Sequence, residues 1–142
     1  MTLGRTYAEA AAKDGTLGME RVVDASDVPC DSLAMLANAA AARCDRVPEA
    51  SMEWSLEPAY EVWTFRRTRN DGNAKLLVGV HPRQSVTFAT VPCRELSLVV
   101  WRALRRLESD PVWRAPPDEM LSAWSWPFPS AETLALGKKL GR

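Results

Sequence analysis

The alternation of apolar and polar residues between positions 60 and 90 predicts three short β-strands joined by two tight turns. The first strand, residues 60–68, is followed by Asp71 and Gly72. This pair is typical of a two-residue type I′ turn, because glycine accepts a positive φ freely. Such a loop fixes the register of the hairpin. The expected pairs are Phe65 with Val78, Trp63 with Val80, and Arg67 with Leu76.

The second turn falls within residues 81–85. A three-residue loop from Pro82 to Gln84 keeps the apolar face continuous, whereas a two-residue loop would send Val86 and Phe88 to the opposite face. The expected pairs are Val80 with Val86, Val78 with Phe88, and Leu76 with Thr90. The expected core face consists of Trp63, Phe65, Leu76, Val78, Val80, Val86 and Phe88. The expected outer face, which is largely polar, consists of Thr64, Arg66, Thr68, Lys75, Leu77, Gly79, Ser85, Thr87 and Ala89.

A helix from Cys93 to Glu108 is expected next, because Pro92 ends the third strand and apolar residues then recur at helical spacing. Its packing stripe is Cys93, Leu96, Val100, Ala103, Leu104 and Leu107. A bare three-stranded sheet is only marginally stable, so we expect this helix to cover the apolar face. The β-β-β-α core, residues 60–108, predicts an α+β fold: a three- or four-stranded antiparallel sheet with one face covered by helices. This order of elements implies no function.

The opposite side of the same helix is a candidate partner-binding surface. Leu98 and Trp101 project there beside Arg94 and Arg105. A single exposed apolar residue is ordinary, but a leucine and a tryptophan ringed by arginines are typical of a surface that meets a partner.

The segments before the core extend the prediction. A short helix is expected from Thr6 to Lys13, and a brief strand at residues 19–24. A second helix starts at Pro29 or Asp31 and runs to Cys44, with a narrow stripe formed by Leu33, Leu36, Ala37, Ala40 and Cys44. The alternation of Met52, Trp54 and Leu56 predicts an edge strand, which would make the sheet four-stranded.

The segment after the core, residues 111–142, is rich in tryptophan and proline. Short helices are expected at residues 117–124 and 131–140, the latter capped by Ser130. The aromatic rings allow two interpretations. Either they fold back over the Leu98 and Trp101 side and complete the core, or they form a partner surface that includes Trp124 and Trp126.

Composition fits one soluble globular domain of 142 residues, 46% hydrophobic and 25% charged. The single domain divides into a helical acidic part (1–58), the core (60–108) and the C-terminal segment (111–142). The absence of a long apolar run or a signal peptide leads us to expect a cytoplasmic protein. Charge is uneven: residues 1–60 hold 5 Lys/Arg against 10 Asp/Glu, whereas residues 61–110 hold 9 against 5. The acidic part and the basic part could attract each other, within one chain or between two subunits, or each could attract a different partner.

Candidate chemistry is sparse, and neither a metal site nor a cofactor is expected. The three cysteines, Cys30, Cys44 and Cys93, lack a Cys-x-x-Cys spacing and fit reduced thiols. Cys93 starts a helix, where a thiolate is favoured, but His81, the only histidine, lies at the other end of a strand, roughly 20 Å away at about 3.3 Å per residue. Cys93 is thus either a packed thiol or a reactive site. The carboxylates Asp24, Asp27 and Asp31 match no Ca²⁺ loop and suit turns and helix caps instead.

The main function hypothesis is a non-enzymatic protein-binding module, such as an adaptor, inhibitor, immunity protein or chaperone-like accessory factor, acting as a homodimer. Phosphate-binding glycine loops, nucleophile elbows and zinc-protease helices are absent from the sequence. One alternative is a sequence-tolerant nucleic-acid binder that uses Arg66, Arg69, Lys75 and Arg83, although the predicted outer face offers no aromatic rings for base stacking. The second alternative is a small thiol-dependent enzyme or sensor at Cys93.

Overall fold

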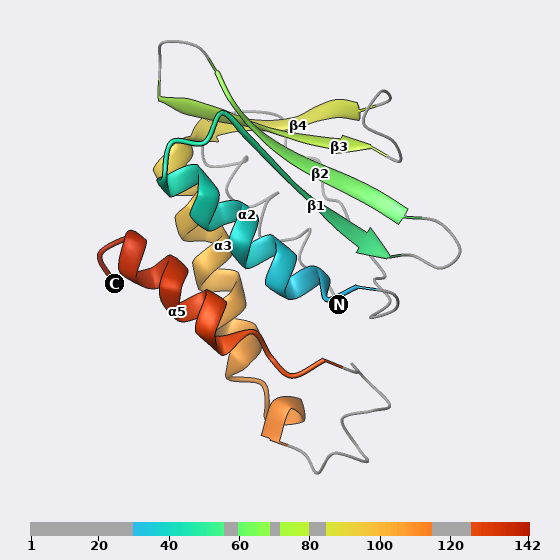
Figure 1. Ribbon diagram of the computed structural model, residues 1–142, viewed down its shortest axis with the longest axis vertical. Helices are drawn as coiled ribbons and strands as arrows, with labels where there is room; N and C mark the ends of the chain where they lie inside the picture. Colours follow the sequence, from blue (N-terminus) through green and yellow to red (C-terminus); the bar gives the residue numbers. More distant parts are fainter. Residues whose placement is uncertain (1–29, 56–59, 69–71, 80–84, 115–125) are drawn as a thin grey trace.

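A computed structural model of the chain describes residues 30–55, 60–68, 72–79, 85–114 and 126–142. The fold is α+β, and a four-stranded antiparallel sheet packs against helices (Figure 1). In chain order the elements are α2 (Ser32–Cys44), β1 (Glu49–Ser55), β2 (Tyr60–Arg67), β3 (Asn73–Gly79), β4 (Ser85–Pro92), α3 (Cys93–Glu108), a 3-10 turn η1 (Pro111–Arg114) and α5 (Ser130–Lys139). The predicted elements at residues 6–13, 19–24 and 117–124 lie outside the described residues.

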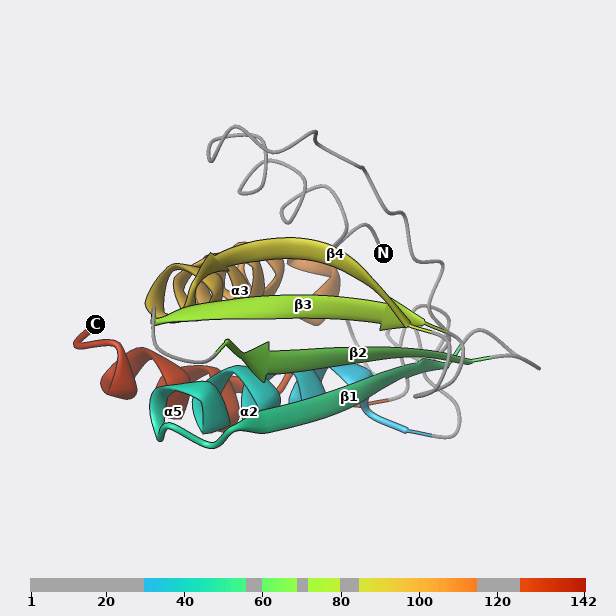
Figure 2. The same ribbon diagram turned by 90° about the horizontal axis from the view of Figure 1, so that it is seen from above.

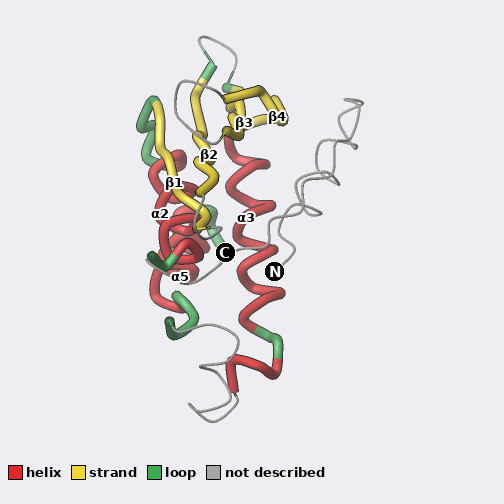
Figure 3. Tube along the Cα trace, turned by 90° about the vertical axis from the view of Figure 1, so that its right-hand side faces the viewer, coloured by secondary structure: helices red, strands yellow, loops and turns green. Residues whose placement is uncertain are grey.

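The strands follow one another across the sheet in the order β1-β2-β3-β4, and each neighbouring pair is antiparallel (Figure 2). The predicted edge strand is therefore confirmed as β1. The helix α2 packs on β1 and β2, α3 packs on β3 and β4, and α5 packs on both helices. Figure 3 shows α2 and α5 gathered on the side of β1, with α3 on the side of β4. The helices thus cover one face of the sheet, as predicted.

The register of the first predicted hairpin is wrong by two residues. Trp63 pairs with Val78 and Phe65 pairs with Leu76. A two-residue loop at Asp71 and Gly72 would instead have paired each of them with the residue two positions further along the chain. The backbone N–H of Thr68 donates to the carbonyl of Asn73 at 3.0 Å, so the two strands remain paired up to these residues. Gly72 still has the positive φ, 71°, that motivated the prediction. A shift of two residues keeps every side chain on its predicted face, because the period of a strand is two.

The face prediction fails in β4, where a bulge interrupts the pairing with β3. Leu77 pairs with Thr87 but Leu76 pairs with Ala89, so Phe88 is an extra residue opposite the ladder. The extra residue shifts the alternation by one position, so Ala89 and Val91 are buried in the core, whereas Phe88 is only partly buried and packs against it. Val86 is 63% exposed, so its predicted place in the core is wrong. The predicted loop from Pro82 to Gln84 lies outside the described residues.

The outer face of the sheet is also more buried than its predicted polar character suggests. Leu77, Val62 and Thr64 lie on this face and are buried. All three belong to the central strands β2 and β3, whose side chains have neighbours on both sides.

The core lies between the sheet and the helices. Trp54 and Trp63 form an edge-to-face pair with ring centroids 5.4 Å apart, and the indole of Trp63 donates to the buried Glu61 carboxylate at 2.7 Å. The predicted stripe of α3 is confirmed, since Leu96, Val100, Ala103 and Leu104 are buried and Cys93 and Leu107 pack at its margins. The helices α2 and α3 meet where Ser97 Oγ donates to the Ala40 carbonyl at 3.1 Å.

The C-terminal segment folds back on the helices. The predicted last helix is confirmed as α5, but its predicted cap is wrong, because Pro129 is the N-cap and Ser130 is the first helical residue. The rings of Trp113 and Phe128 meet edge to face with centroids 5.1 Å apart. Both rings pack against the core. This arrangement agrees with the first of the two interpretations of the aromatic segment for these two rings, whereas Trp126 remains 40% exposed.

Candidate functional site

A small pocket lies where three helix ends meet: the end of α2, the start of α3 and the end of α5, which gather on one side of the molecule in Figure 1. Its volume is about 190 Å³, and it is lined by Arg43, Cys44, Cys93, Arg94, Ser97, Lys139 and Leu140. We call it the Arg43 pocket. Pockets for drug-sized ligands have volumes of roughly 300–1,000 Å³, so this one suits a group of a few heavy atoms.

Arg43 is the most unusual residue of the pocket because its charge is buried. The residue is 4% exposed, and among the residues that the structure describes no carboxylate pairs with it. Nη1 donates to the carbonyl of Val47, Nη2 donates to Cys93 Sγ at 3.5 Å, and Nε has no acceptor. Buried charges in proteins are normally paired, because the desolvation of an unpaired ion costs on the order of several kcal/mol.

The turn after α2 holds the guanidinium in place. Val47 N–H donates to the Ala42 carbonyl at 3.2 Å and Arg46 N–H donates to the Arg43 carbonyl at 3.3 Å, which together form a Schellman motif. This motif requires a left-handed residue, and Arg46 occupies it with a φ of 61°. The chain therefore reverses sharply, so that the Val47 carbonyl points back at the Arg43 side chain.

Two further cations line the pocket from the other helices. Arg94 Nη2 donates to the Leu140 carbonyl at 2.8 Å, which joins the start of α3 to the end of α5. Lys139 pairs with the exposed carboxylate of Asp45 at 2.6 Å. The partial positive charge at the N-terminus of α3 adds to these cations, while the interaction of Arg94 offsets the partial negative charge at the end of α5. The three cations and the start of α3 favour an anion, whereas the partial negative charge at the end of α2 opposes one.

Cys93 and Cys44 both line this pocket, and both thiols are free and half-buried. Cys93 accepts a hydrogen bond from Arg43, whereas Cys44 Sγ donates to the Ala40 carbonyl of its own helix at 3.7 Å. Cys93 therefore packs at the start of α3 with a cation as its neighbour, and whether it is reactive stays a prediction. His81 lies outside the described residues. No group of three or more His, Cys, Asp or Glu that could hold a metal ion occurs in the part of the chain that the structure describes.

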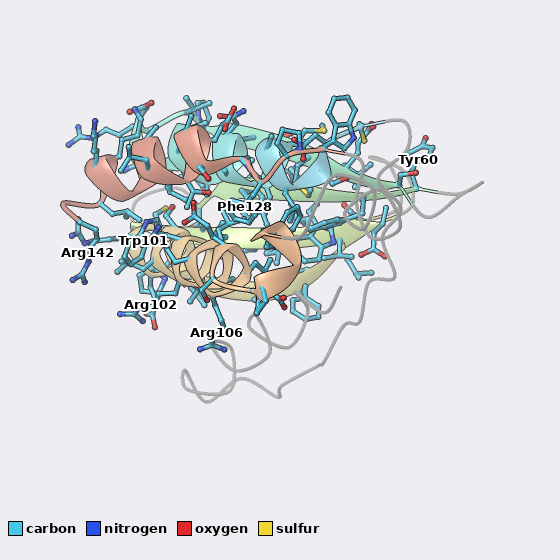
Figure 4. The ribbon with its side chains drawn as sticks, turned by 90° about the horizontal axis from the view of Figure 1, so that it is seen from below. Tyr60, Trp101, Arg102, Arg106, Phe128 and Arg142 are labelled. Carbon is cyan, nitrogen blue, oxygen red and sulfur yellow. The ribbon has the colours of Figure 1, made fainter. Side chains whose placement is uncertain are left out.

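The predicted partner-binding residues do not form one exposed patch. Leu98 and Trp101 are half-buried and pack against the core, because α5 lies over that side of α3. Viewed from the helical side, Figure 4 shows Trp101 at the boundary between α3 and α5, with Arg102 and Arg106 projecting away from α3. Arg94 belongs to the Arg43 pocket, and Arg105 pairs with Glu108. Trp126 is exposed, and Trp124 lies outside the described residues.

The predicted nucleic-acid residues are only partly described. Arg66 pairs with Glu49 across β1 and β2 at 2.7 Å, and Lys75 is exposed on the same outer face, opposite Arg66. Arg69 and Arg83 lie outside the described residues. Asp31 is confirmed as a helix cap, since its Oδ1 accepts from the Ala34 N–H at 3.2 Å. Burial raises the pKa of this carboxyl, and Glu132 nearby raises it further, against the opposing hydrogen bonds from the backbone of Ala34 and Leu33.

Arg43 is the residue that the sequence analysis missed. Its position carries a signal, because it lies three residues after Ala40 and continues the buried stripe that contains Leu36. A charged residue on the apolar stripe of a helix indicates either a buried charge or the end of the stripe. Because Arg43 lies in the last turn of the helix, the sequence alone favours the end of the stripe over a buried charge.

Comparisons with models of protein families, with curated proteins and with solved structures found no match. None of the described helices is both long enough and apolar enough to cross a membrane.

Proposed function

We propose that this chain is a non-enzymatic binding protein that holds a single oxyanion group, carboxylate or phosphate, in the Arg43 pocket. The observation that carries this proposal is the buried Arg43 guanidinium with no carboxylate partner among the described residues and no acceptor for Nε. A bound anion would supply the missing charge. The small volume of the pocket limits the ligand to one such group, or to one end of a larger molecule.

The shape of the guanidinium supports the same proposal. Nε and Nη2 lie on one edge of its plane and present two parallel N–H donors, the arrangement that carboxylates and phosphates match with two hydrogen bonds. In Arg43 one donor of this edge has no acceptor and the other meets only the weak acceptor Cys93 Sγ. The opposite side of the group, Nη1, is held by Val47. The edge that Val47 leaves without a strong acceptor is therefore the one whose geometry best suits an oxyanion.

Thermal unfolding in phosphate, acetate and chloride at equal ionic strength tests the proposal. At a ligand concentration of 100 times Kd, binding stabilises the folded state by about 2.7 kcal/mol, which is roughly 5–10 °C in Tm for a chain of this length. We expect phosphate or acetate to raise Tm above the chloride value, and Arg43→Gln to lose this response.

The matched control is Arg102→Gln, which removes an exposed arginine of α3 that does not line the pocket. It should keep the full response. If Arg43→Gln does not fold, Arg94→Gln should reduce the response instead. Equal responses of the wild type, Arg94→Gln and Arg102→Gln would contradict the proposal, because they would indicate general salt effects.

A protein partner is a second candidate, favoured by the exposure of Trp126 (40%) and Leu134 (59%) on the C-terminal segment. Tryptophan is a frequent anchor of protein interfaces. We propose this pair, in place of Leu98 and Trp101, as the apolar part of a protein-binding or homodimer surface. Light scattering after size exclusion, at low and high salt, tests self-association. A dimer that Trp126→Ser with Leu134→Ser converts to a monomer supports the homodimer, and a dimer unaffected by these changes contradicts it.

A further inference from the structure

We propose that Cys93 is a modification site, at which hydrogen peroxide oxidises the thiol to a sulfinate that pairs with Arg43 and closes the Arg43 pocket. The closure depends on the proposed function, since it concerns the regulation of the same pocket. The oxidation itself depends only on the contacts between Cys93 and Arg43.

The first argument is the position of the sulfur. Cys93 Sγ lies 3.5 Å from Arg43 Nη2 and lines the pocket, where a small oxidant can reach it. Nε, on the same edge of the guanidinium, has no acceptor. Two oxygens on this sulfur would find two N–H donors side by side, and the negative charge of the group would compensate a cation that is 4% exposed.

The second argument is the contrast with Cys44. This thiol lines the same pocket and is half-buried like Cys93, but its contact is the Ala40 carbonyl, an acceptor that would repel an anionic group. The two cysteines thus share their access to solvent and differ in the charge beside them. An Arg43-dependent reaction should select Cys93.

The chemistry has two steps, each of which consumes one hydrogen peroxide. In the first, sulfur attacks one peroxide oxygen, the O–O bond breaks, and the thiol and peroxide become a sulfenic acid and water. In the second, the sulfenic sulfur attacks another peroxide in the same way, which gives a sulfinic acid and water. The sulfinic acid releases its proton to solvent. Sulfur is oxidised by two electrons in each step, and peroxide is reduced.

Peptide mass spectrometry of the reduced full-length chain, treated with hydrogen peroxide at neutral pH, tests the proposal. We expect a gain of two oxygen atoms on Cys93 roughly tenfold faster than on Cys44, the size of effect typical of hydrogen bonds to charged groups. Arg43→Gln should abolish the difference, whereas Arg102→Gln should preserve it. Equal oxidation of both cysteines, a disulfide between them, or selectivity that survives Arg43→Gln would overturn the proposal.

A second variant keeps the test decisive if Arg43→Gln fails to fold. Cys93→Asp places a permanent carboxylate beside Arg43, so it should raise Tm above that of the uncharged Cys93→Asn. Equal Tm values would overturn the pairing with Arg43. The anion response is measured separately. Its absence in wild type with both phosphate and acetate would count against the proposed function, whereas its survival in the oxidised wild type would count against closure alone.

Discussion

Gly137 of α5 lies against the indole ring of Trp101 of α3. A Cβ at position 137 would be 2.7 Å from Trp101 Nε1 and 3.4 Å from its Cε2. The contact explains two observations together. The helix α5 approaches α3 closely because residue 137 has no side chain, and Trp101 is half-buried because α5 covers it.

Gly137→Ala should therefore destabilise the protein, although alanine favours a helix over glycine by about 1 kcal/mol. We expect a loss of about 1–3 kcal/mol in the free energy of unfolding, typical of overpacking, measured by urea denaturation. In a Trp101→Leu background the smaller side chain leaves room for the methyl group, and the same change should become neutral or stabilising. A stabilising Gly137→Ala in the wild-type background would show that α5 does not approach α3 as described.

Arg46→Gly should stabilise the protein. Arg46 has a φ of 61° in the turn that ends α2, and a non-glycine residue in this region costs about 1–2 kcal/mol. Glycine loses part of this gain through the greater freedom of the unfolded chain, so we expect a net gain of about 0.5–1 kcal/mol. Arg46→Ala retains Cβ and serves as the control. An equal gain from both changes would assign the effect to loss of the arginine charge rather than to the backbone.

Asp31→Asn should change how stability depends on pH. Burial raises the pKa of the folded Asp31 carboxyl above its unfolded value of about 4. At pH values between the unfolded and the folded pKa, the folded state therefore binds more protons than the unfolded state. The contribution of Asp31 to stability is thus greatest below pH of about 4 and falls as the pH rises through the raised pKa. Asparagine caps helices about as well as aspartate and does not titrate.

The stability of Asp31→Asn relative to wild type should accordingly increase as the pH rises from acid to neutral and then become constant. Urea denaturation at several pH values measures this difference and cancels the titration of the other groups. A difference that decreases with rising pH would mean that the charged form is the one favoured by the fold.

Ser97→Ala and Ser97→Val should separate two properties of the contact between α2 and α3. Loss of the hydroxyl that donates to the Ala40 carbonyl should cost about 0.5–1.5 kcal/mol. Valine adds volume at a position that is 1% exposed, so it should cost more, by about 1–3 kcal/mol. Chemical denaturation measures both changes. Similar values for alanine and valine would show that the interface has spare room.

The elements of the core could be predicted from the sequence because their signals are local. The bounds of α3, Cys93–Glu108, agree with the prediction because Pro92 precedes the helix and its apolar stripe is wide. The face assignment of Trp63 and Phe65 also holds, although their partners differ. A register error of two residues changes no face, so periodicity could not have revealed it.

The bulge at Phe88 and the site could not be predicted in the same way. Periodicity favours Phe88 over Ala89 as a core residue, but the observed pairing inserts Phe88 as an extra residue. The Arg43 pocket combines residues from positions 43, 93 and 139, and each of them alone is ordinary in its helix. Only the packing of three helix ends brings these residues together, and no local pattern records that packing.

The bulge in β4 also bears on how copies of this chain would meet. β4 and β1 are the outer strands of the described sheet. Addition of a further strand requires a regular succession of N–H and C=O groups, which a bulge interrupts. β1 carries the exposed carboxylate Glu53, which would repel an identical strand alongside, whereas the charge of Glu49 is compensated by Arg66. The sheet is therefore protected against growth into fibrils at both margins, and polymerisation through its strands should be slow even at high concentration.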